Sequence, residues 1–388
     1  MQLVAYGAQD IYLTGNPQIT FFKVVYRRHT NFAMEAIEQT WNGTDGTSED
    51  PAAGRCTATI SRNGDLVHRM YLEQDVDTDD NKSNPSAASI TNITLEIGGQ
   101  QIDKQGGQWM NIWSHLTEQN PSGHVGASIA GTTDGTLFQN MSGMGGMYTR
   151  GTSNNAKYWV PLQFWFCRNP GLALPLIALQ YHEVKVILEH DFTLGGHTAV
   201  NSNNLWCDYI YLDTDERRRF AQVSHEYLIE QVQEQTITAA VSSDLNFNHP
   251  VKELVFCVTA TTGVLAAIGS SAATYQLKLN GHDRFAARDW RYFSRTQVWQ
   301  HHSGTGGLNA SAAANTAGGL DGAQNDSIGV YSFALKPEEH QPSGTCNFSR
   351  IDNAQLVQTA NGAATMCYAV NYNVLRIMSG MGGLAYSN

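Results

Sequence analysis

The stretch Leu95-Glu96-Ile97-Gly98-Gly99-Gln100 alternates apolar and polar residues and then enters a glycine turn, and Leu277-Lys278-Leu279-Asn280-Gly281-His282 repeats this form. Such alternation is typical of a β-strand with one buried face. The two leucine-led stretches are separated by one constant shift, from 95 to 277, and an aromatic segment follows each, at Trp109–Trp113 and Asp289–Phe293. A repeat near half the chain length indicates a duplicated β-domain, because solenoid repeats recur every 20–50 residues or so.

Strand patterns dominate the rest of the chain, and helical patterns are short. The predicted strands are Ile19–Tyr26, Ala33–Trp41, Arg55–Ser61, Leu66–Val76, Ile90–Ile97, Tyr158–Cys167, Ile177–Glu189, Leu205–Leu212, Tyr227–Ala239, Leu254–Ala260, Tyr275–Leu279, Tyr331–Leu335, Ile351–Gln358 and Met366–Met378. The predicted helices are Gln108–Leu116, Thr214–Phe220 and Asp289–Trp299. Alternating strand and helix units are missing from this pattern. It therefore favours an all-β protein of sandwiches or barrels, with short helices in the loops.

Two segments interrupt the strand pattern. Thr214–Phe220 is a charge cluster in which acidic residues precede three arginines, an order typical of a helix start. We place the junction between the two halves there. Ser303–Gly329 is rich in Gly, Ala, Ser and Asn and has little apolar surface to bury, so we expect it to form an exposed loop.

Composition excludes several classes of function. The 388 residues suffice for two or three domains. Only 15% of them are charged, which favours association with other subunits. The net charge is −11 and no basic block is longer than Arg217–Arg219, so direct binding of nucleic acid is not expected. We expect these arginines to be solvated or ion-paired at the junction.

The six cysteines are widely spaced and form no C-x-x-C motif. Several lie in apolar strand patterns, such as Val255-Phe256-Cys257, so we interpret them as buried free thiols in a reducing compartment. The first residues lack the charged and apolar regions of a signal peptide, and no apolar run approaches the 18 or so residues that a membrane helix requires.

No catalytic or metal-binding constellation stands out. His301 and His302 are adjacent and would point to opposite faces of a strand. His182 and His190 could share a strand face but would lie roughly 26 Å apart at the rise of a strand. We interpret these two as solvent-face or interface histidines. No G-x-S-x-G, H-E-x-x-H or phosphate-loop motif occurs, so we expect no enzyme activity and no cofactor.

Two weaker patterns remain. The hexapeptide Met-Ser-Gly-Met-Gly-Gly occurs at Met141–Gly146 and again at Met378–Gly383, and we interpret it as a loop that packs on a neighbouring surface. Asn-x-Ser/Thr triplets are weak glycosylation signals here. Asn309 and Asn325 are the better candidates, because both lie in the expected exposed loop.

The N-terminal run Gly7–Ala33, which includes Leu13-Thr14-Gly15-Asn16-Pro17, closely resembles the start of the major capsid proteins of nucleocytoplasmic large DNA viruses. Three further stretches resemble the same family, at Ile177–Leu188, Tyr209–Phe220 and Tyr372–Tyr386. The resemblance covers both ends and the junction. The chain looks short for this family, so any surface towers should be small.

The resemblance implies a double jelly roll, with two tandem eight-stranded jelly rolls in one chain. Its expected division is residues 1–18 as a base segment, 19–213 as the first jelly roll, 214–223 as a linker and 224–388 as the second. The implied role is that of a major capsid protein. Homotrimers would form pseudo-hexagonal capsomers of an icosahedral shell over an internal membrane.

The resemblance also implies partners and a location. The partners would be further copies of the chain, penton and minor capsid proteins and, indirectly, the inner membrane layer, but not nucleic acid. We expect assembly in the host cytoplasm and residence in the virion. The base segment would contact the inner layer or adjacent subunits through Tyr6, Ile11, Tyr12 and Leu13.

Two alternatives compete with this interpretation. One is a minor capsid or scaffold paralogue with the same fold, which relative abundance in purified particles would distinguish. The other is a carbohydrate-binding or bicupin-like double β-barrel. The missing H-x-H metal motif argues against a bicupin.

Overall fold

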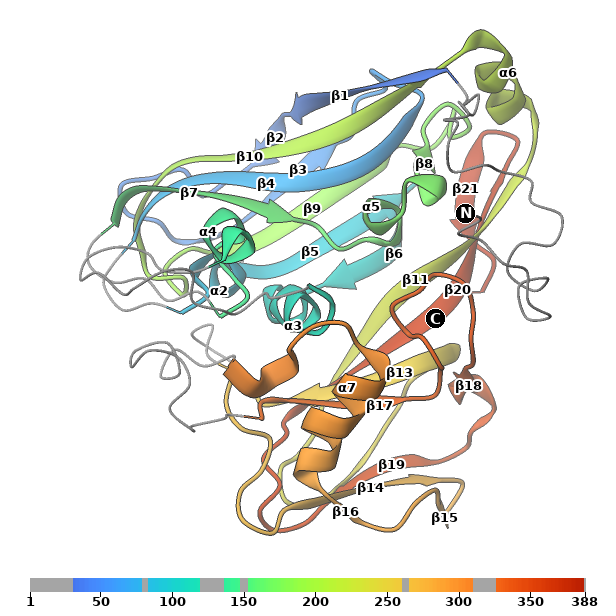
Figure 1. Cartoon of the computed structure of the whole chain (residues 1–388). Coiled ribbons are helices and arrows are strands. Elements are labelled where there is room, and N and C mark those ends of the chain that lie inside the picture. The colour runs from blue at the N-terminus through green and yellow to red at the C-terminus, as the bar shows by residue number, and fades with distance from the viewer. Residues whose placement is uncertain are drawn as a thin grey trace, which may run out of the picture.

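The computed structural model describes residues 31–78, 83–118, 136–146, 153–259, 265–309 and 326–386, and these residues form four antiparallel β-sheets (Figure 1). Residues 32–212 build two of the sheets and residues 225–384 build the other two. Helix α6 (Thr214–Gln222) connects the two halves. Asp213 caps this helix by accepting a hydrogen bond from the Thr214 amide, and Asp215 and Glu216 lie in its first turn, as a helix N-terminus favours.

In the first half, one sheet has the order β1-β10-β4-β7 and the other β2-β3-β9-β5-β6. The first comprises β1 (Phe32–Gln39), β10 (His197–Leu212), β4 (Leu66–Thr78) and β7 (Ser153–Pro161), with β8 (Leu174–Pro175) beside β4. The second comprises β2 (Trp41–Gly43), β3 (Ala53–Thr59), β9 (Val184–Asp191), β5 (Ile90–Ile97) and β6 (Gln100–Gln105). The helical segments are α2 (Pro85–Ser89), α3 (Gly107–Thr117), α4 (Leu137–Ser142), α5 (Trp165–Arg168) and η1 (Pro170–Leu172).

The second half repeats this arrangement, with the orders β11-β20-β13-β17 and β12-β19-β14-β15. Its first sheet comprises β11 (His225–Thr236), β20 (Met366–Met378), β13 (Pro250–Cys257) and β17 (Ile328–Ser332), with β18 (Cys346–Asn347) beside β13 and β21 (Met381–Leu384) beside β20. Its second sheet comprises β12 (Ser242–Asp244), β19 (Ala354–Gln358), β14 (Thr274–Leu279) and β15 (His282–Asp283), with β16 (Arg288–Asp289) beside β14. The helical segments are η2 (Tyr292–Thr296), α7 (Gln297–His301), η3 (Gly306–Asn309) and η4 (Phe348–Arg350).

Each half is therefore a two-sheet jelly roll, and the predicted all-β double jelly roll is confirmed. Strand β1 pairs with β10, which pairs with β4, and in the same way β11 pairs with β20, which pairs with β13. Each pair of sheets encloses its own apolar core. We call the halves the first roll (the sheets of residues 32–212) and the second roll (the sheets of residues 225–384).

The repeated leucine stretches occupy equivalent places, as predicted. Strand β5 lies between β9 and β6, and β14 lies between β19 and β15. Both strands end in a two-residue turn, at Gly98–Gly99 and at Asn280–Gly281, and all four of these residues have positive φ. Such a turn matches the twist of the paired strands, and Gly and Asn adopt it at low cost. The aromatic segments then form α3 in the first roll and η2 with α7 in the second.

Three segments differ from the predictions. Phe164–Cys167 was expected to continue a strand, but β7 ends at Pro161 and Trp165–Arg168 forms α5. Residues 177–183 form turns and bends before β9 begins, instead of a strand. The run Phe164–Cys167 is apolar throughout and has no period that separates strand from helix.

The predicted exposed loop Ser303–Gly329 is also wrong at both ends. Gly306 and Gly307 are buried in η3, and Asp326 and Ser327 are buried before β17. The Asp326 carboxylate accepts hydrogen bonds from Ser294 and Arg295, which fixes this end of the segment against η2. The middle of the segment, residues 310–325, and the predicted strand Ile19–Tyr26 lie outside the described residues.

Candidate functional site: the junction between the two rolls

Helix α3 belongs to the first roll but packs on the second. Its residue Met110 lies in the core of the first roll, whereas Trp109, Ile112, Trp113 and Leu116 form a separate buried cluster with strands β13, β17 and β20. The rings of Trp109 and Tyr368 lie 5.1 Å apart between centroids. Burial of such large aromatic side chains contributes several kcal/mol, so α3 acts as an apolar bridge between the rolls.

The bridge explains why β13 is buried on both faces. Leu254 and Phe256 point into the core of the second roll, and the alternate residues Val255 and Cys257 pack against α3. An antiparallel sheet with one wet face would expose every second residue. Here the sheet is covered by α3 instead, and the second half of the strand, Leu254–Cys257, is apolar throughout.

A buried ionic cluster lies beside the bridge. The Glu230 carboxylate on β11 pairs with Lys252 Nζ at 2.8 Å and with Arg168 Nη1 at 2.9 Å, and His340 Nδ1 lies 3.7 Å away. The Lys252 side chain has 0% exposure. Burial opposes ionisation of Glu230, but His340, Lys252 and Arg168 outweigh it and lower its pKa to about 2. Because Arg168 comes from α5, this cluster ties the first roll to the second.

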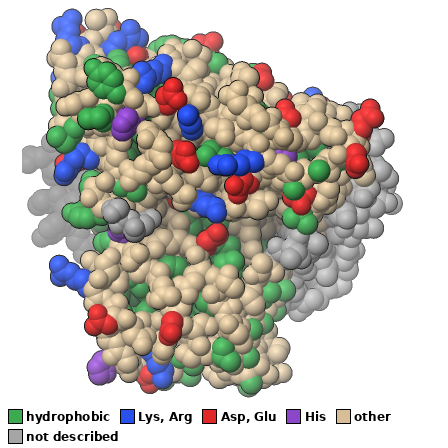
Figure 2. Space-filling model, turned by 180° about the vertical axis from the view of Figure 1, so that it is seen from behind, with side chains coloured by type: hydrophobic (Ala, Val, Ile, Leu, Met, Phe, Trp, Pro, Cys, Tyr) green, Lys and Arg blue, Asp and Glu red, His purple; other side chains and the backbone are tan. Residues whose placement is uncertain are grey.

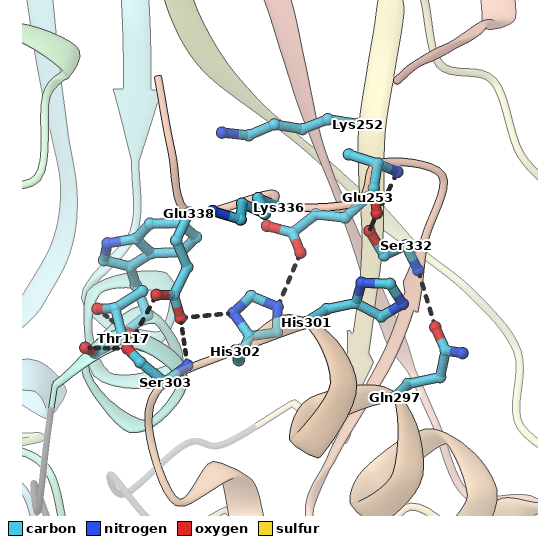
Figure 3. A network of polar contacts seen from close by, with 12 residues as sticks. Thr117, Lys252, Glu253, Gln297, His301, His302, Ser303, Ser332, Lys336 and Glu338 are labelled. Carbon is cyan, nitrogen blue, oxygen red and sulfur yellow. Dashed lines mark hydrogen bonds and ion pairs between the residues drawn. The ribbon is translucent and has the colours of Figure 1, made fainter. Parts of the chain in front are cut away.

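A second cluster centres on His302, directly after α7 (Figure 3). Its Nε2 lies 2.9 Å from Glu253 Oε2 and its Nδ1 lies 3.1 Å from Glu338 Oε1. Burial disfavours the imidazolium, but the two carboxylates overcome this and raise the pKa of His302 to about 9. His302 is therefore charged at neutral pH and donates from both ring nitrogens.

The rolls meet again where the hexapeptide Met378–Gly383 turns between β20 and β21. The Tyr181 amide donates to the Gly380 carbonyl, and the ring of His182 contacts the backbone of Gly382. Gly380 has positive φ and lies so close to the Tyr181 ring that an added Cβ would clash. The predicted role as a loop packed on a neighbouring surface is confirmed for this copy, and the surface is the first roll.

The other copy of the hexapeptide, Met141–Gly146, ends α4 and also packs inside the protein. Gly143 closes the helix in the left-handed conformation, and the Gly145 amide donates to the Asn111 side chain on α3. Both copies therefore serve as compact turns, which need glycine for their backbone angles.

The cysteines and the arginine run lie as predicted. All six cysteines are unpaired; five are buried and Cys346 is partly buried. Burial raises the pKa of the Cys56 and Cys257 thiols to about 12. Arg217 pairs with Asp65 at 3.0 Å and Arg219 with Glu216 at 3.5 Å.

The two candidate histidines His182 and His190 have different environments in the structure. His182 lies at the contact between the rolls, as expected for an interface residue. His190 is buried against Phe192, with Nε2 2.9 Å from the Thr44 carbonyl, so its predicted solvent or interface position is wrong. In the described ranges no group of three or more His, Cys, Asp or Glu side chains is arranged to hold a metal ion.

The remaining candidates were Tyr6, Ile11, Tyr12, Leu13, Asn309 and Asn325. The four base-segment residues and Asn325 lie outside the described residues. Asn309 is the last residue of η3, and its side chain is likewise outside the description. Within the described ranges, no helix is both long and apolar enough to cross a lipid bilayer.

Sequence patterns did not reveal the two ionic clusters. One signal was present: Lys252 and Glu253 interrupt the apolar strand Val251–Cys257 at adjacent positions, which places a charge on each face of a buried strand. Buried charges require partners, but the partners are Glu230 on β11 for Lys252 and His302 after α7 for Glu253, both far away in the chain.

The outer surface is largely uncharged. Figure 2 shows Lys, Arg, Asp and Glu side chains spread over one face with both signs interspersed, among wide areas of neutral surface. Large apolar side chains are also exposed, among them Phe32 and Met34 on β1, and Tyr181 and Met381 beside the hexapeptide turn. Surfaces of this kind favour association.

Comparison with known proteins agrees with this architecture. Residues 20–213 match the family described as the major capsid protein N-terminus. Residues 216–309 and 321–383 match the large eukaryotic DNA virus major capsid protein family. The matches together cover both rolls.

Individual relatives span the whole chain. The major capsid protein of Pyramimonas orientalis virus is 51% identical, over 100% of this chain and 99% of the relative. That of Paramecium bursaria Chlorella virus 1 is 39% identical with the same coverage. The second alignment extends over 472 positions, so that relative carries insertions that this 388-residue chain lacks.

The fold is also similar to solved capsid structures. The crystal structure of PBCV-1 VP54 has a TM-score of 0.74 and 34% identity, and covers 95% of this chain and 100% of that chain. The Faustovirus major capsid protein, at 12% identity, shares the fold with a TM-score of 0.66. The relatives are named as structural proteins, which confirms the prediction of a structural rather than an enzymatic role. The chain belongs to the family of large eukaryotic DNA virus major capsid proteins.

Proposed function

We propose that this capsid protein forms a homotrimer with a pseudo-hexagonal outline, which tiles an icosahedral virus shell. The observation that carries the proposal is the equivalence of the two rolls, which share the strand order of both sheets apart from the extra edge strand β2 of the first roll. Three chains with two similar rolls each present six similar units around one axis. A near-sixfold outline packs a surface without gaps, while threefold symmetry is kept.

The uncharged surface supports the same proposal. A shell subunit buries much of its surface against neighbours, and few charges then have to lose their hydration. The net charge of −11 and the absence of a long basic run in the sequence fit a shell that does not bind the genome directly. Neighbouring capsomers, penton proteins and minor capsid proteins are the partners of this proposal.

The proposed division of the chain is a base segment (1–18), a first jelly roll (19–213), a linker (214–223) and a second jelly roll (224–388). In the proposed capsomer the base segment lies on the inner side of the shell. There Tyr6, Ile11, Tyr12 and Leu13 contact the layer over the internal membrane or adjacent subunits. Assembly takes place in the host cytoplasm.

The test is native mass measurement of the purified chain. We expect a species of three times the 42.6 kDa chain mass that persists on dilution. A monomer at micromolar concentration would contradict the proposed trimer. Quantifying the protein in purified particles distinguishes a major protein, which dominates the shell, from a minor paralogue.

The base segment is tested separately, by deleting residues 1–18. We expect trimers to form and shell assembly to fail, because the deletion removes contacts outside the rolls. Replacing Tyr6, Ile11, Tyr12 and Leu13 together with serine should give the same result. Unchanged shell assembly after the deletion would refute the role of the segment.

A further inference from the structure

The His302 cluster connects three segments of the second roll with the first roll. Glu253 comes from β13, Glu338 from the segment after β17, and His302 from the end of α7. The next residue, Ser303, donates from its backbone amide to Glu338 and from its hydroxyl to the carbonyl of Thr117, the last residue of α3. Figure 3 shows these groups converging on the end of that helix.

Two further contacts extend this connection. The Gly304 amide donates to the Leu116 carbonyl at 2.8 Å, and the edge of the His302 ring faces the Trp113 ring. The guanidinium group of Arg168, on α5, lies over the Trp113 ring, 4.2 Å from the ring centroid. The end of α3 is therefore held by the segment His302–Gly304, and that segment is held by Glu338 and Glu253.

The two carboxylates around His302 exceed its single positive charge, and the nearest further cations, Lys252 and Arg168, pair with Glu230. Glu253 and Glu338 contact it directly, and burial of Glu338 is outweighed by His302 and Ser303, which lower its pKa. The neighbouring cluster of Glu230, Lys252, Arg168 and His340 lies alongside, since Lys252 precedes Glu253 and His340 follows Glu338 by two residues. On α3 itself, burial lowers the pKa of His115 to about 4, so this group stays neutral.

If His302 lost its proton, the buried Glu253 carboxylate would lose the positive charge beside it. The Glu253 side chain has 0% exposure, and its Oε1 has no hydrogen-bond partner. A neutral imidazole donates from only one nitrogen, so it can satisfy either Glu253 or Glu338 but not both. If Nε2 keeps the proton, Glu253 keeps its donor, and Glu338 keeps the Ser303 amide and hydroxyl. In either tautomer the buried Glu253 carboxylate loses the positive charge that offsets its burial, which is costly in a water-poor interior.

Solvent reaches the clusters through a cavity of about 220 Å³ at the junction. Its lining includes Arg168, Glu230, Glu338 and His340. The Glu338 carboxylate thus borders both the cavity and His302. Protons can exchange between solvent and the cluster through this opening without unfolding of either roll.

We propose that His302, Glu253 and Glu338 form a proton-operated latch, which holds the end of α3 on the second roll while His302 is charged and loosens when His302 loses its proton. The latch is closed in acidic and neutral solution and opens in alkaline solution. Since the imidazole of an unfolded chain titrates near pH 6.5 and that of His302 near 9, the stabilisation is complete below about 6.5 and is lost as the pH rises through 9.

The direct test is the titration of His302 in the wild-type assembly, by mass spectrometry of deuterium exchange at the imidazole C2 position. We expect a pKa at least one unit above that of His301, whose ring contacts the Leu335 carbonyl and forms no ion pair within the described residues. A value for His302 below 7 overturns the latch, and this measurement needs no variant to fold.

The second test uses His302→Gln with His301→Gln as the matched control. At pH 7 we expect at least tenfold faster backbone exchange in residues 113–118 for H302Q, and no change for H301Q. The melting temperature of the wild type and H301Q should fall between pH 7 and 10 by more than that of H302Q. Equal pH dependence in all three proteins, or unchanged exchange in residues 113–118, overturns the proposal.

Discussion

Replacing Glu230 by Gln tests how strongly the ionic cluster at the junction stabilises the protein. Glutamine keeps the shape of the side chain and resembles the neutral carboxyl group. The partners of Glu230 lower its pKa from 4.5 to about 2. One pKa unit corresponds to about 1.4 kcal/mol, so the ionised form is favoured by about 3 kcal/mol in the folded protein. E230Q should lose about this much, because Lys252 and Arg168 also lose their counter-charge.

The pH dependence of this loss can be stated with its sign. The folded pKa of Glu230 is lower than that of the unfolded chain, so its contribution is complete above about pH 4.5 and disappears as the pH falls through 2. The free energies of unfolding of wild type and E230Q should therefore differ by a constant amount at pH 5–7. The difference should shrink on acidification.

The assay is urea-induced unfolding at a fixed protein concentration, followed by tryptophan fluorescence at pH 7, 5 and 3.5. The matched control is Glu226→Gln on the same strand, since Glu226 pairs with Arg376 at 2.8 Å with both side chains more than half exposed. Such a pair contributes at most about 1 kcal/mol. A loss below 1 kcal/mol for E230Q, or a loss equal to that of E226Q, would refute the reasoning.

Three further outcomes are expected. Trp109→Ala should cost about 3–5 kcal/mol in urea unfolding because it empties the apolar bridge, whereas Trp299→Ala, with 81% of the side chain exposed, should change stability by less than 0.5 kcal/mol or so. Gly281→Ala should cost about 1–2 kcal/mol for backbone reasons alone, because φ is +75° and an added Cβ meets no atom within 4 Å; Gly281→Asn should cost less, and equal melting temperatures for both variants and wild type would contradict this. Titration with a thiol reagent at pH 8 should modify Cys346 first and the buried thiols only after denaturation, whereas rapid reaction of all six in the native protein would show that the cores are open.

The fold could be predicted largely from local patterns. The alternation around Leu95 and Leu277 identifies strands because their buried and exposed faces follow directly from the period of two. The turn chemistry of Asn280–Gly281 identifies a hairpin without any knowledge of distant contacts. These signals involve only neighbouring residues, so they can be recognised in the sequence of each roll separately.

The wrong predictions concern segments whose burial is decided by contacts with distant parts of the chain and not by a local pattern. Phe164–Cys167 is apolar throughout because α5 lies in a crowded core, and such a run fits a strand and a helix equally well. Asp326 and Ser327 were assigned to an exposed loop from composition, but Ser294 and Arg295 donate to Asp326 across more than 30 residues of sequence, and Ser327 donates to the Gly307 carbonyl. The junction clusters were missed for the same reason, since Glu230 meets Lys252 and Arg168, and His302 meets Glu253, only across long stretches of sequence.

The glycine turn at Met378–Gly383 has a consequence for the order in which the chain folds. During synthesis the ribosome releases this turn after every strand of both rolls except β21. The first roll can therefore form its sheets early, but the surface around Leu179 and Tyr181 stays uncovered until the turn arrives and Gly380 and Gly382 close onto it. A chain interrupted before this point would leave Leu179 without the backbone of Gly382 over it, so the last strand of the second roll completes the surface of the first.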